Sequence, residues 1–442
     1  MPTAKTTRVR WFLVFWLFVL SAVSYLDRVN ISIAGGSIVD AYHLTDVQLG
    51  KVFSALVAGY ALFQTVGGRL ADRFGPRIVL TAGVLWWGIF TALTALVPAN
   101  IRGALLLFVV VRFLLGAGEA VIYPAANQFV ARWIPVSERG IANGWIFAGV
   151  GAGAGLTPPL ITYLMTHYGW RSSFWVCAVI GLVAGAVWFF AARNDPAEHP
   201  QVSPAELAEI QSGLFVTSLS PNQGRAPASV PVPWKRVLRS REVWAVTISY
   251  FCYGYAAWIF FSWFYRYLVK VRGLDLKASS FYSMLPFLAM LVCCLLGGTV
   301  NDRLTKWRGP RLGRCGLAAV AMAVAGVFIA FGSQVQGVRL ASVVLAGGAG
   351  ALYFSQSSFW SVTADIAGAS AGSVSGFMNM GGQIGGALTG SLTPWIAARY
   401  GWAASFLVAG GLCLLGGICW LAVDPLHSLI EERVGEVLEI HR

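Results

Sequence analysis

Four charged side chains lie inside apolar segments of the sequence. Asp27 and Arg28 are adjacent in the first of these segments, and Arg112 and Glu119 stand seven residues apart in the fourth. An ionisable side chain within a bilayer costs roughly 2.5–3.5 kcal/mol on insertion scales, so it is seldom kept without a task. A carboxyl group can take up and release a proton, and an arginine can hold a carboxylate through two parallel hydrogen bonds. These four residues predict an ion or substrate pathway.

The segments that position these charges dominate the chain of 442 residues, of which 57% are hydrophobic and 12% charged. Soluble domains average about 45–50% and 25%. A membrane-spanning helix needs about 20 apolar residues, and twelve segments qualify, which predicts an all-α membrane protein with twelve transmembrane helices. They lie near residues 11–35, 47–70, 78–98, 103–127, 141–166, 172–193, 242–268, 280–300, 315–333, 338–364, 371–397 and 402–423. The first is too long for a signal peptide and is followed by eleven more, so we expect it to be retained.

Basic residues near the segment ends predict the orientation. Of the 32 lysines and arginines, 21 fall on the side of the N-terminus and nine on the other, while Arg28 and Arg112 lie within segments. Because cytoplasmic loops are enriched in Lys and Arg, we expect both termini in the cytoplasm. Compact loops and a short tail favour a bacterial inner membrane. The net charge of +13 is then explained by the basic residues of the cytoplasmic loops. Nucleic-acid binding is not expected, because it would need a basic face on a soluble domain.

The loops after the second and the eighth segments repeat one pattern at an offset of 230 residues. The first reads Gly68-x-x-x-Asp72-Arg73-x-Gly75-x-Arg77 and the second Gly298-x-x-x-Asp302-Arg303. Two related halves of six helices each explain this repeat economically. We therefore divide the chain into an N-terminal half, 1–193, a cytoplasmic central loop, 194–241, a C-terminal half, 242–423, and a cytoplasmic tail, 424–442.

The central loop begins with the signature of a helix start, in which Ser203 is the N-cap, Pro204 the first helical residue and Glu206 the third. Residues 221–233 then have the composition of a flexible tether, which would let two rigid halves rock. In the tail, apolar residues between positions 426 and 440 recur at helical spacing. A surface helix explains that pattern as well as a partner site does.

Several motifs together resemble those of a known family. The Gly68–Arg77 segment is similar to the signature loop of the major facilitator superfamily. Within that superfamily, the segments around Asp27-Arg28 and around Arg112 and Glu119 resemble the anion:cation symporter family. That family includes proton-coupled galactonate, hexuronate and glucarate carriers of bacteria and organic-anion and vesicular glutamate carriers of animals. The resemblance covers essentially the whole chain and implies proton-coupled uptake of an organic anion, most often a sugar acid, by alternating access.

The buried charges can be assigned roles on this basis. We expect Asp27 and Glu119 to carry protons and Arg28 and Arg112 to bind the anionic substrate, and the resemblance supports the two acids as proton sites. The competing interpretation is that Asp27 pairs with Arg112 or Arg28 only to hold helices one and four together. A buried ion pair often contributes little net stability, so that interpretation explains the four charges less well.

Polar residues of the second half are expected to contact the hydroxylated part of the substrate. The candidates are Gln356, Trp360, Asn379 and Gln383, together with Tyr60 from the first half. Asn379 and Tyr60 match family positions near a bound sugar acid. An interhelical hydrogen bond is the alternative role for each. Val150 stands where galactonate carriers have a glutamine, which leaves the particular substrate open.

The repeated loops are expected to act as a gate. The superfamily resemblance implies that Asp72, Arg73 and Arg77 of the first loop and Asp302 and Arg303 of the second pair across the halves and hold the outward-open state. Topology anchors alone are the alternative.

Other classes of function find little support. The sequence has no metal-ligand cluster, no HExxH motif and no nucleophile set at a membrane face, so we expect no enzyme, no metal and no cofactor. The expected partners are a small organic anion, protons and the lipid bilayer, and we expect a monomer. A proton-independent anion exchanger, an exporter and a transporter-like sensor stay open at this stage.

Overall fold

The computed structural model describes residues 6–44, 46–99, 103–214, 232–264, 267–268, 271–274, 276–427 and 429, and these residues form helices and loops without a strand. Prolines and glycines mark many helix starts. Gly75 adopts φ 84° just before Pro76, and Gly169 and Gly401 adopt φ 79° and 84° between consecutive helices. The first half contains α1 (Val9–Tyr42), α2 (Asp46–Phe74), α3 (Pro76–Leu96), α4 (Ala104–Glu119), α5 (Ile122–Trp133), α6 (Arg139–Tyr168) and α7 (Trp170–Ala191).

The second half repeats this order after two short helices. Those are α8 (Pro204–Gly213) and α9 (Trp234–Val237). The second half itself contains α10 (Arg241–Ser262), α12 (Leu276–Arg308), α13 (Leu317–Gln334), α14 (Val338–Phe354), α15 (Gln356–Ala367), α16 (Ala371–Tyr400) and α17 (Trp402–Cys419).

Apart from the short helices α8 and α9, these helices form twelve membrane spans. Eleven stretches of the described residues are long and apolar enough to cross a bilayer. The twelfth is α16, a helix of 30 residues whose glycines, Asn379 and Gln383 lower its hydropathy. The length of α16, about 45 Å at 1.5 Å per residue, suffices to cross.

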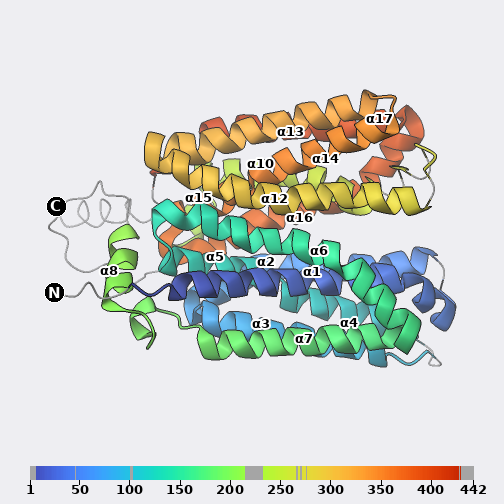
Figure 1. The fold of residues 1–442 in the computed structure, drawn as a ribbon, viewed down its shortest axis with the longest axis horizontal. Coiled ribbons are helices and arrows are strands. Elements are labelled where there is room, and N and C mark those ends of the chain that lie inside the picture. The colour runs from blue at the N-terminus through green and yellow to red at the C-terminus, as the bar shows by residue number, and fades with distance from the viewer. Residues whose placement is uncertain are drawn as a thin grey trace.

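The two halves form two bundles that lie against each other (Figure 1). The first half, blue to green, lies below the second half, yellow to red, and α8 lies at one end of the molecule. We call this end, where α8 meets the start of α1, the α8 end, and the opposite one the far end. The helix pairs that join the halves are mainly α6 with α12 and α2 with α16.

Two of the spans are broken at matching places in the two halves. The span Ala104–Trp133 breaks between α4 and α5, and the span Val338–Ala367 breaks at Ser355 between α14 and α15. Pro124 explains the first break, because it lacks the N–H that a continuous helix would use there. Each break places a polar residue beside it: Glu119 ends α4, and Gln356 begins α15. Irregular backbone inside a bilayer is tolerated where it is buried in protein or lines a cavity.

Helix α8 begins where the sequence predicts. The Ser203 hydroxyl accepts from the N–H of Glu206 at 3.2 Å, and Pro204 is the first helical residue. The buried Glu206 carboxylate in turn caps α1, because it accepts from the backbone N–H groups of Val9 and Arg10, both at 3.1 Å. The central loop is therefore anchored to the first half through α8. Most of the predicted tether, residues 221–231, and most of the predicted tail helix lie outside the described residues.

Candidate functional site

A cavity lies between the two halves, at the level of the broken spans. Its volume is about 50 Å³, small beside the roughly 300–1,000 Å³ of ligand pockets, so its walls are nearly in contact. Six tyrosines and three amides supply its polar surface, and no charged side chain lines it. The lining residues are Tyr25, Tyr60, Tyr123, Phe147, Val150, Tyr250, Tyr253, Gly254, Ala257, Trp258, Phe261, Met290, Tyr353, Gln356, Asn379, Gly382 and Gln383.

Arg28 lies directly behind the first-half wall of this cavity. Its guanidinium stacks on the rings of Tyr60 and Tyr25, 4.0 and 5.0 Å from their centroids. The same group donates from Nε to Glu119 Oε2 at 2.7 Å, and both side chains are nearly or fully buried. This pair joins α1 to α4. Among the described residues, Arg28 Nη2 and Glu119 Oε1 have no hydrogen-bond partner.

Asp27 points away from the cavity, because adjacent residues of a helix face directions about 100° apart. Its Oδ2 accepts from the Thr91 hydroxyl of α3 at 3.4 Å, and its Oδ1 has no hydrogen-bond partner among the described residues. No ion pair within 4.0 Å involves Asp27 in the part of the chain that the structure describes. Buried Arg112 likewise has an unpartnered Nε. The pairing of Asp27 with Arg28 or Arg112 that we considered from the sequence is therefore replaced by a pair between Arg28 and Glu119.

Three of the four predicted polar residues of the second half reach the cavity. Asn379 and Gln383 line it from α16, and Gln356 lines it from α15. Asn379 donates to Gln64 of α2 at 2.8 Å, a bond that joins the halves. Gln356 donates to the Tyr250 hydroxyl at 3.0 Å.

Trp360 lies behind this wall. Its ring packs on Phe147 at 4.9 Å and on Tyr123 at 5.8 Å, and its Nε1 has no partner among the described residues. Trp360 therefore supports two rings of the first half that line the cavity.

Sequence reasoning missed several residues of this site. Gln64 is fully buried and lies one helical turn after Tyr60, so its spacing from a predicted residue was the available signal. Tyr123, Tyr250, Tyr253 and Tyr353 also line the cavity. A tyrosine within a hydrophobic segment gives no clear signal, because its ring packs equally well in an ordinary core.

The two repeated aspartates close the α8 end of the molecule by matching contacts. Asp72 accepts from the backbone N–H groups of Gly372 and Ser373, at 3.0 and 2.8 Å, and also from the Ser373 hydroxyl. These groups belong to the start of α16 in the other half. Asp302 accepts from the N–H groups of Gly140 and Ile141, at 2.8 and 2.6 Å, at the start of α6. Each carboxylate thus caps a helix of the opposite half, where the helix dipole favours negative charge.

The repeated arginines lie differently. Arg73 stacks on Phe74, and Arg77 donates to the Phe189 carbonyl at 2.9 Å, so both contact their own half. No ion pair within 4.0 Å involves Arg73, Arg77 or Arg303 among the described residues. The contacts between the halves therefore join carboxylates to helix ends, where we had expected pairs of opposite charges.

A buried ion-pair network strengthens the contact between α6 and the second half. Asp365 accepts from Arg139 of the first half at 2.7 Å, and its Oδ2 forms an ion pair with Arg314 Nε of the second half, 2.6 Å away. Arg314 also lies 3.5 Å from Asp302. Asp365 directly follows the predicted segment 338–364, and nothing in the sequence indicates these partners.

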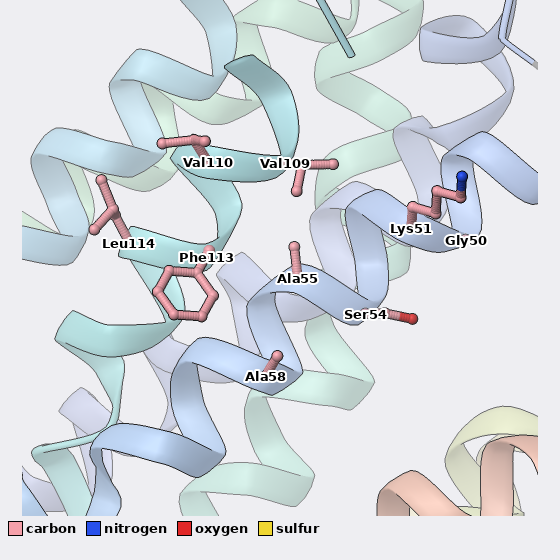
Figure 2. Close-up of a pocket in the computed structure, with 9 residues that line it drawn as sticks. All are labelled: Gly50, Lys51, Ser54, Ala55, Ala58, Val109, Val110, Phe113 and Leu114. Carbon is pink, nitrogen blue, oxygen red and sulfur yellow. The ribbon is translucent and has the colours of Figure 1, made fainter. Parts of the chain in front are cut away.

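Larger grooves occur on the outer surface of the helix bundle. One, of about 670 Å³, lies between α2 and α4 towards the far end (Figure 2). Small side chains such as Ala55 and Ala58 face Phe113 and Val109 across it, and Lys51 stands at one edge. It contains none of the predicted site residues and faces the hydrocarbon region, so the smaller cavity between the halves is the candidate site.

Comparisons with known proteins identify the family. The sequence pattern of the Major Facilitator Superfamily matches residues 17–390. The chain belongs to this superfamily and is a multi-pass membrane transporter. It is 33% identical over 419 residues, 94% of each chain, to the probable sulfoacetate transporter SauU of Cupriavidus necator. It is 34% identical over 307 residues to the probable galactarate/D-glucarate transporter GudP of Bacillus subtilis, covering 69% of this chain and 67% of that one. The chloroplastic ascorbate transporter of Arabidopsis thaliana is 32% identical over 413 residues, 93% of this chain and 74% of that one.

Solved structures confirm the fold. The proton:xylose symporter XylE superposes with a TM-score of 0.72 at 15% identity, over 95% of this chain and 98% of that one. FucP in its outward conformation gives a TM-score of 0.67 at 17% identity, over 94% and 99%. The predicted fold of twelve transmembrane helices in two halves is therefore correct.

Proposed function

We propose that this protein takes up an organic anion together with protons across the bacterial inner membrane, by alternating access, with both termini in the cytoplasm. The relatives support an anionic cargo, since they are named for sulfoacetate, for galactarate and glucarate, and for ascorbate. Sugar acids are the class that we expect first. In this orientation the α8 end is cytoplasmic, and the structure, closed at that end, corresponds to an outward-facing or occluded state.

The observation that carries the proposal is the buried pair between Arg28 and Glu119. Glu119 forms an ion pair with the Arg28 guanidinium, which an incoming carboxylate would need. The rings of Tyr25 and Tyr60, which line the cavity, lie against that guanidinium. A proton on Glu119 removes its negative charge and weakens its hold on Arg28. The substrate carboxylate then takes the place of the Glu119 carboxylate, so proton and anion bind together.

Asp27 and Arg112 extend this arrangement away from the cavity. Both are buried, and each has a nitrogen or oxygen atom without a partner among the described residues. In our proposal Asp27 is a second proton site, and Arg112 offsets its charge while it is ionised. One proton with a monoanion is electroneutral, whereas a second proton would add one net charge, worth roughly 2.3 kcal/mol per 100 mV of membrane potential.

The two aspartate caps supply the gate. When substrate and protons are bound, the halves rock, Asp72 and Asp302 leave the starts of α16 and α6, and the cavity opens to the cytoplasm. Arg139 must leave Asp365 in the same step, because this ion pair joins opposite halves.

Transport by purified protein in proteoliposomes tests the proposal. Glu119→Gln mimics a permanently protonated carboxyl, so we expect it to abolish accumulation driven by a pH gradient while counterflow exchange of the same anion persists. Glu209→Gln is the matched control, because it makes the same chemical change on α8, outside the membrane spans. Accumulation by Glu119→Gln at the wild-type level would refute the role of Glu119. Wild-type uptake that ignores pH would favour a proton-independent exchanger, and binding without uptake would favour a sensor.

A further inference from the structure

A second groove, of about 600 Å³, lies on the membrane-facing surface at the α8 end, between α1 and α7. Its floor and walls are formed by Phe12 of α1 and by one face of α7 with the loop that follows it. The lining residues are Phe12, Val183, Ala186, Val187, Phe190, Ala191, Arg193, His199, Pro200 and Gln201. The part of α7 that lines the groove, residues 183–191, extends roughly 13 Å at 1.5 Å per residue. That is nearly half of the roughly 30 Å hydrocarbon core, so the groove is about as deep as one leaflet.

Positive charge gathers at the outer rim of this groove. Arg193 lines it and donates from Nη1 only to backbone, the carbonyls of Phe190 at 3.0 Å and Ala192 at 2.8 Å. Arg8 is the exposed N-cap of α1, and its carbonyl accepts from the N–H of Phe12 at 3.3 Å, so Arg8 lies one turn from Phe12 towards the α8 end. In the part of the chain that the structure describes, no carboxylate lies within 4.0 Å of either guanidinium.

The two acids of the following loop, Asp195 and Glu198, make no ion pair with Arg8 or Arg193 among the described residues. The Asp195 carboxylate accepts from the N–H of Ala197 at 2.8 Å, and Glu198 makes no ion pair within 4.0 Å among the described residues. His199 uses both ring nitrogens within the protein: Nδ1 accepts from the N–H of Gln201, and Nε2 donates to the Ala191 carbonyl at 2.9 Å. The charge of the rim therefore comes from Arg8 and Arg193.

We propose that this groove binds one anionic glycerophospholipid of the cytoplasmic leaflet. An acyl chain fills the apolar groove between Phe12 and α7, and the phosphate contacts Arg193 and Arg8. The inference depends on the orientation given under Proposed function, but not on substrate or proton coupling. The cytoplasmic leaflet carries the anionic lipids that attract basic residues near the membrane surface. The groove between α2 and α4 (Figure 2) has a single cation, Lys51, at its edge and serves as an internal comparison.

Native mass spectrometry of the full chain, with phosphatidylglycerol or phosphatidylcholine of identical acyl chains added to the detergent solution, tests the inference. We expect one phosphatidylglycerol to be retained in preference to phosphatidylcholine. Arg193→Gln should weaken its binding roughly fivefold, and Arg8→Gln with Arg193→Gln should remove the preference, since each cation near an anionic surface contributes a factor of about that size. Lys51→Gln is the matched control and should leave the preference unchanged.

A variant that keeps all charges separates the acyl-chain contact from simple attraction of the headgroup. Ala186→Phe fills the groove and should weaken binding of both lipids. Its fold is checked by its transport activity, because Ala186 lies outside the transport site. Equal binding of the two lipids by the wild-type protein would overturn the inference, as would a preference for phosphatidylglycerol that survives in the double arginine variant. Unchanged binding in Ala186→Phe would remove the acyl chain from the proposal and refute it in the form stated.

Discussion

The contact between Asp302 and the start of α6 gives the sharpest quantitative prediction. Asp302 is 1% exposed and accepts two backbone N–H groups at 2.8 and 2.6 Å, with Arg314 at 3.5 Å. In Asp302→Asn the side chain keeps its shape, but the new amide NH₂ faces one of the two N–H donors. One charge-assisted bond between the halves is lost, and the other becomes a weaker bond to a neutral acceptor. Hydrogen bonds to charged groups contribute about 1.5–3 kcal/mol each, so the total loss is about 3 kcal/mol.

This loss applies only to the state closed at the α8 end, because opening separates α6 from α12 and exposes Asp302 to water. The ratio of closed to open molecules should therefore fall by roughly 100-fold, at tenfold for every 1.4 kcal/mol. Arg303→Gln removes the adjacent charge, which makes no ion pair among the described residues, and should leave the ratio nearly unchanged.

Alkylation of an introduced cysteine measures this shift. Ser361 is fully buried and accepts from Asn143 of α6 across the contact between the halves, at 3.3 Å. In Ser361→Cys, a membrane-impermeant maleimide added at the cytoplasmic face should react only with open molecules. The rate should rise roughly 100-fold, less if the open state becomes predominant, when Asp302→Asn is added. The same variants without the new cysteine report the background from the seven native cysteines. An unchanged rate would refute the idea that Asp302 holds the closure.

The remaining predictions concern Arg28 and helix α8. Arg28→Lys keeps the charge but loses the planar group that stacks on Tyr25 and Tyr60 and that can form two hydrogen bonds to one carboxylate. We expect the apparent substrate affinity to fall at least tenfold in uptake assays. An unchanged half-saturation concentration would contradict the role of Arg28 in substrate binding. Glu206→Gln should lower the free energy of unfolding by about 1–3 kcal/mol, because Glu206 is buried and accepts from three donors of the α1 start. Glu209→Gln should lower the free energy of unfolding by less than about 1 kcal/mol, because Glu209 is half exposed. Thermal unfolding in detergent measures which of the two variants is less stable. The hydrogen bond from Arg10 holds the pKa of Glu209 below its usual value, so this small stabilisation is present above pH ~4.3 and is lost as the pH falls through the lowered pKa. The difference between wild type and Glu209→Gln should accordingly shrink on acidification, and a difference that grows would contradict the sign.

The spans were predictable because each depends on local composition. Even α16, whose glycines and amides weaken its hydropathy, matches one of the twelve predicted apolar segments, 371–397. The start of α8 was equally local, because Ser203 and Glu206 lie three residues apart.

Partners distant in the chain were not predictable. Arg28 and Glu119 are 91 residues apart, and adjacency suggested Asp27 as the natural partner of Arg28. Helical geometry could have separated Asp27 from Arg28 by direction, but only the packing of α1 on α3 and α4 decides which acid meets the guanidinium. The partners of Asp72 and Asp302 were missed for another reason. A helix start attracts a carboxylate through its backbone N–H groups, and these are present whatever the residue types, so the sequence does not show which helix start will be the partner.

The capping of the helix starts by Asp72 and Asp302 has a consequence for how the sequence can change in evolution. On the receiving side of the Asp302 cap, both donors belong to the main chain, so Ile141 can be exchanged for almost any residue except proline without removing its donor. At the Asp72 cap, Ser373 also donates from its hydroxyl, so exchanging it removes one of the three donors. Gly140 and Gly372 are different, because a Cβ atom at either position would collide with the capping carboxylate. The closure therefore combines one position that tolerates substitution with two that require glycine. A survey of related sequences should find free variation at 141, a hydroxyl residue favoured at 373, and glycine at 140 and 372.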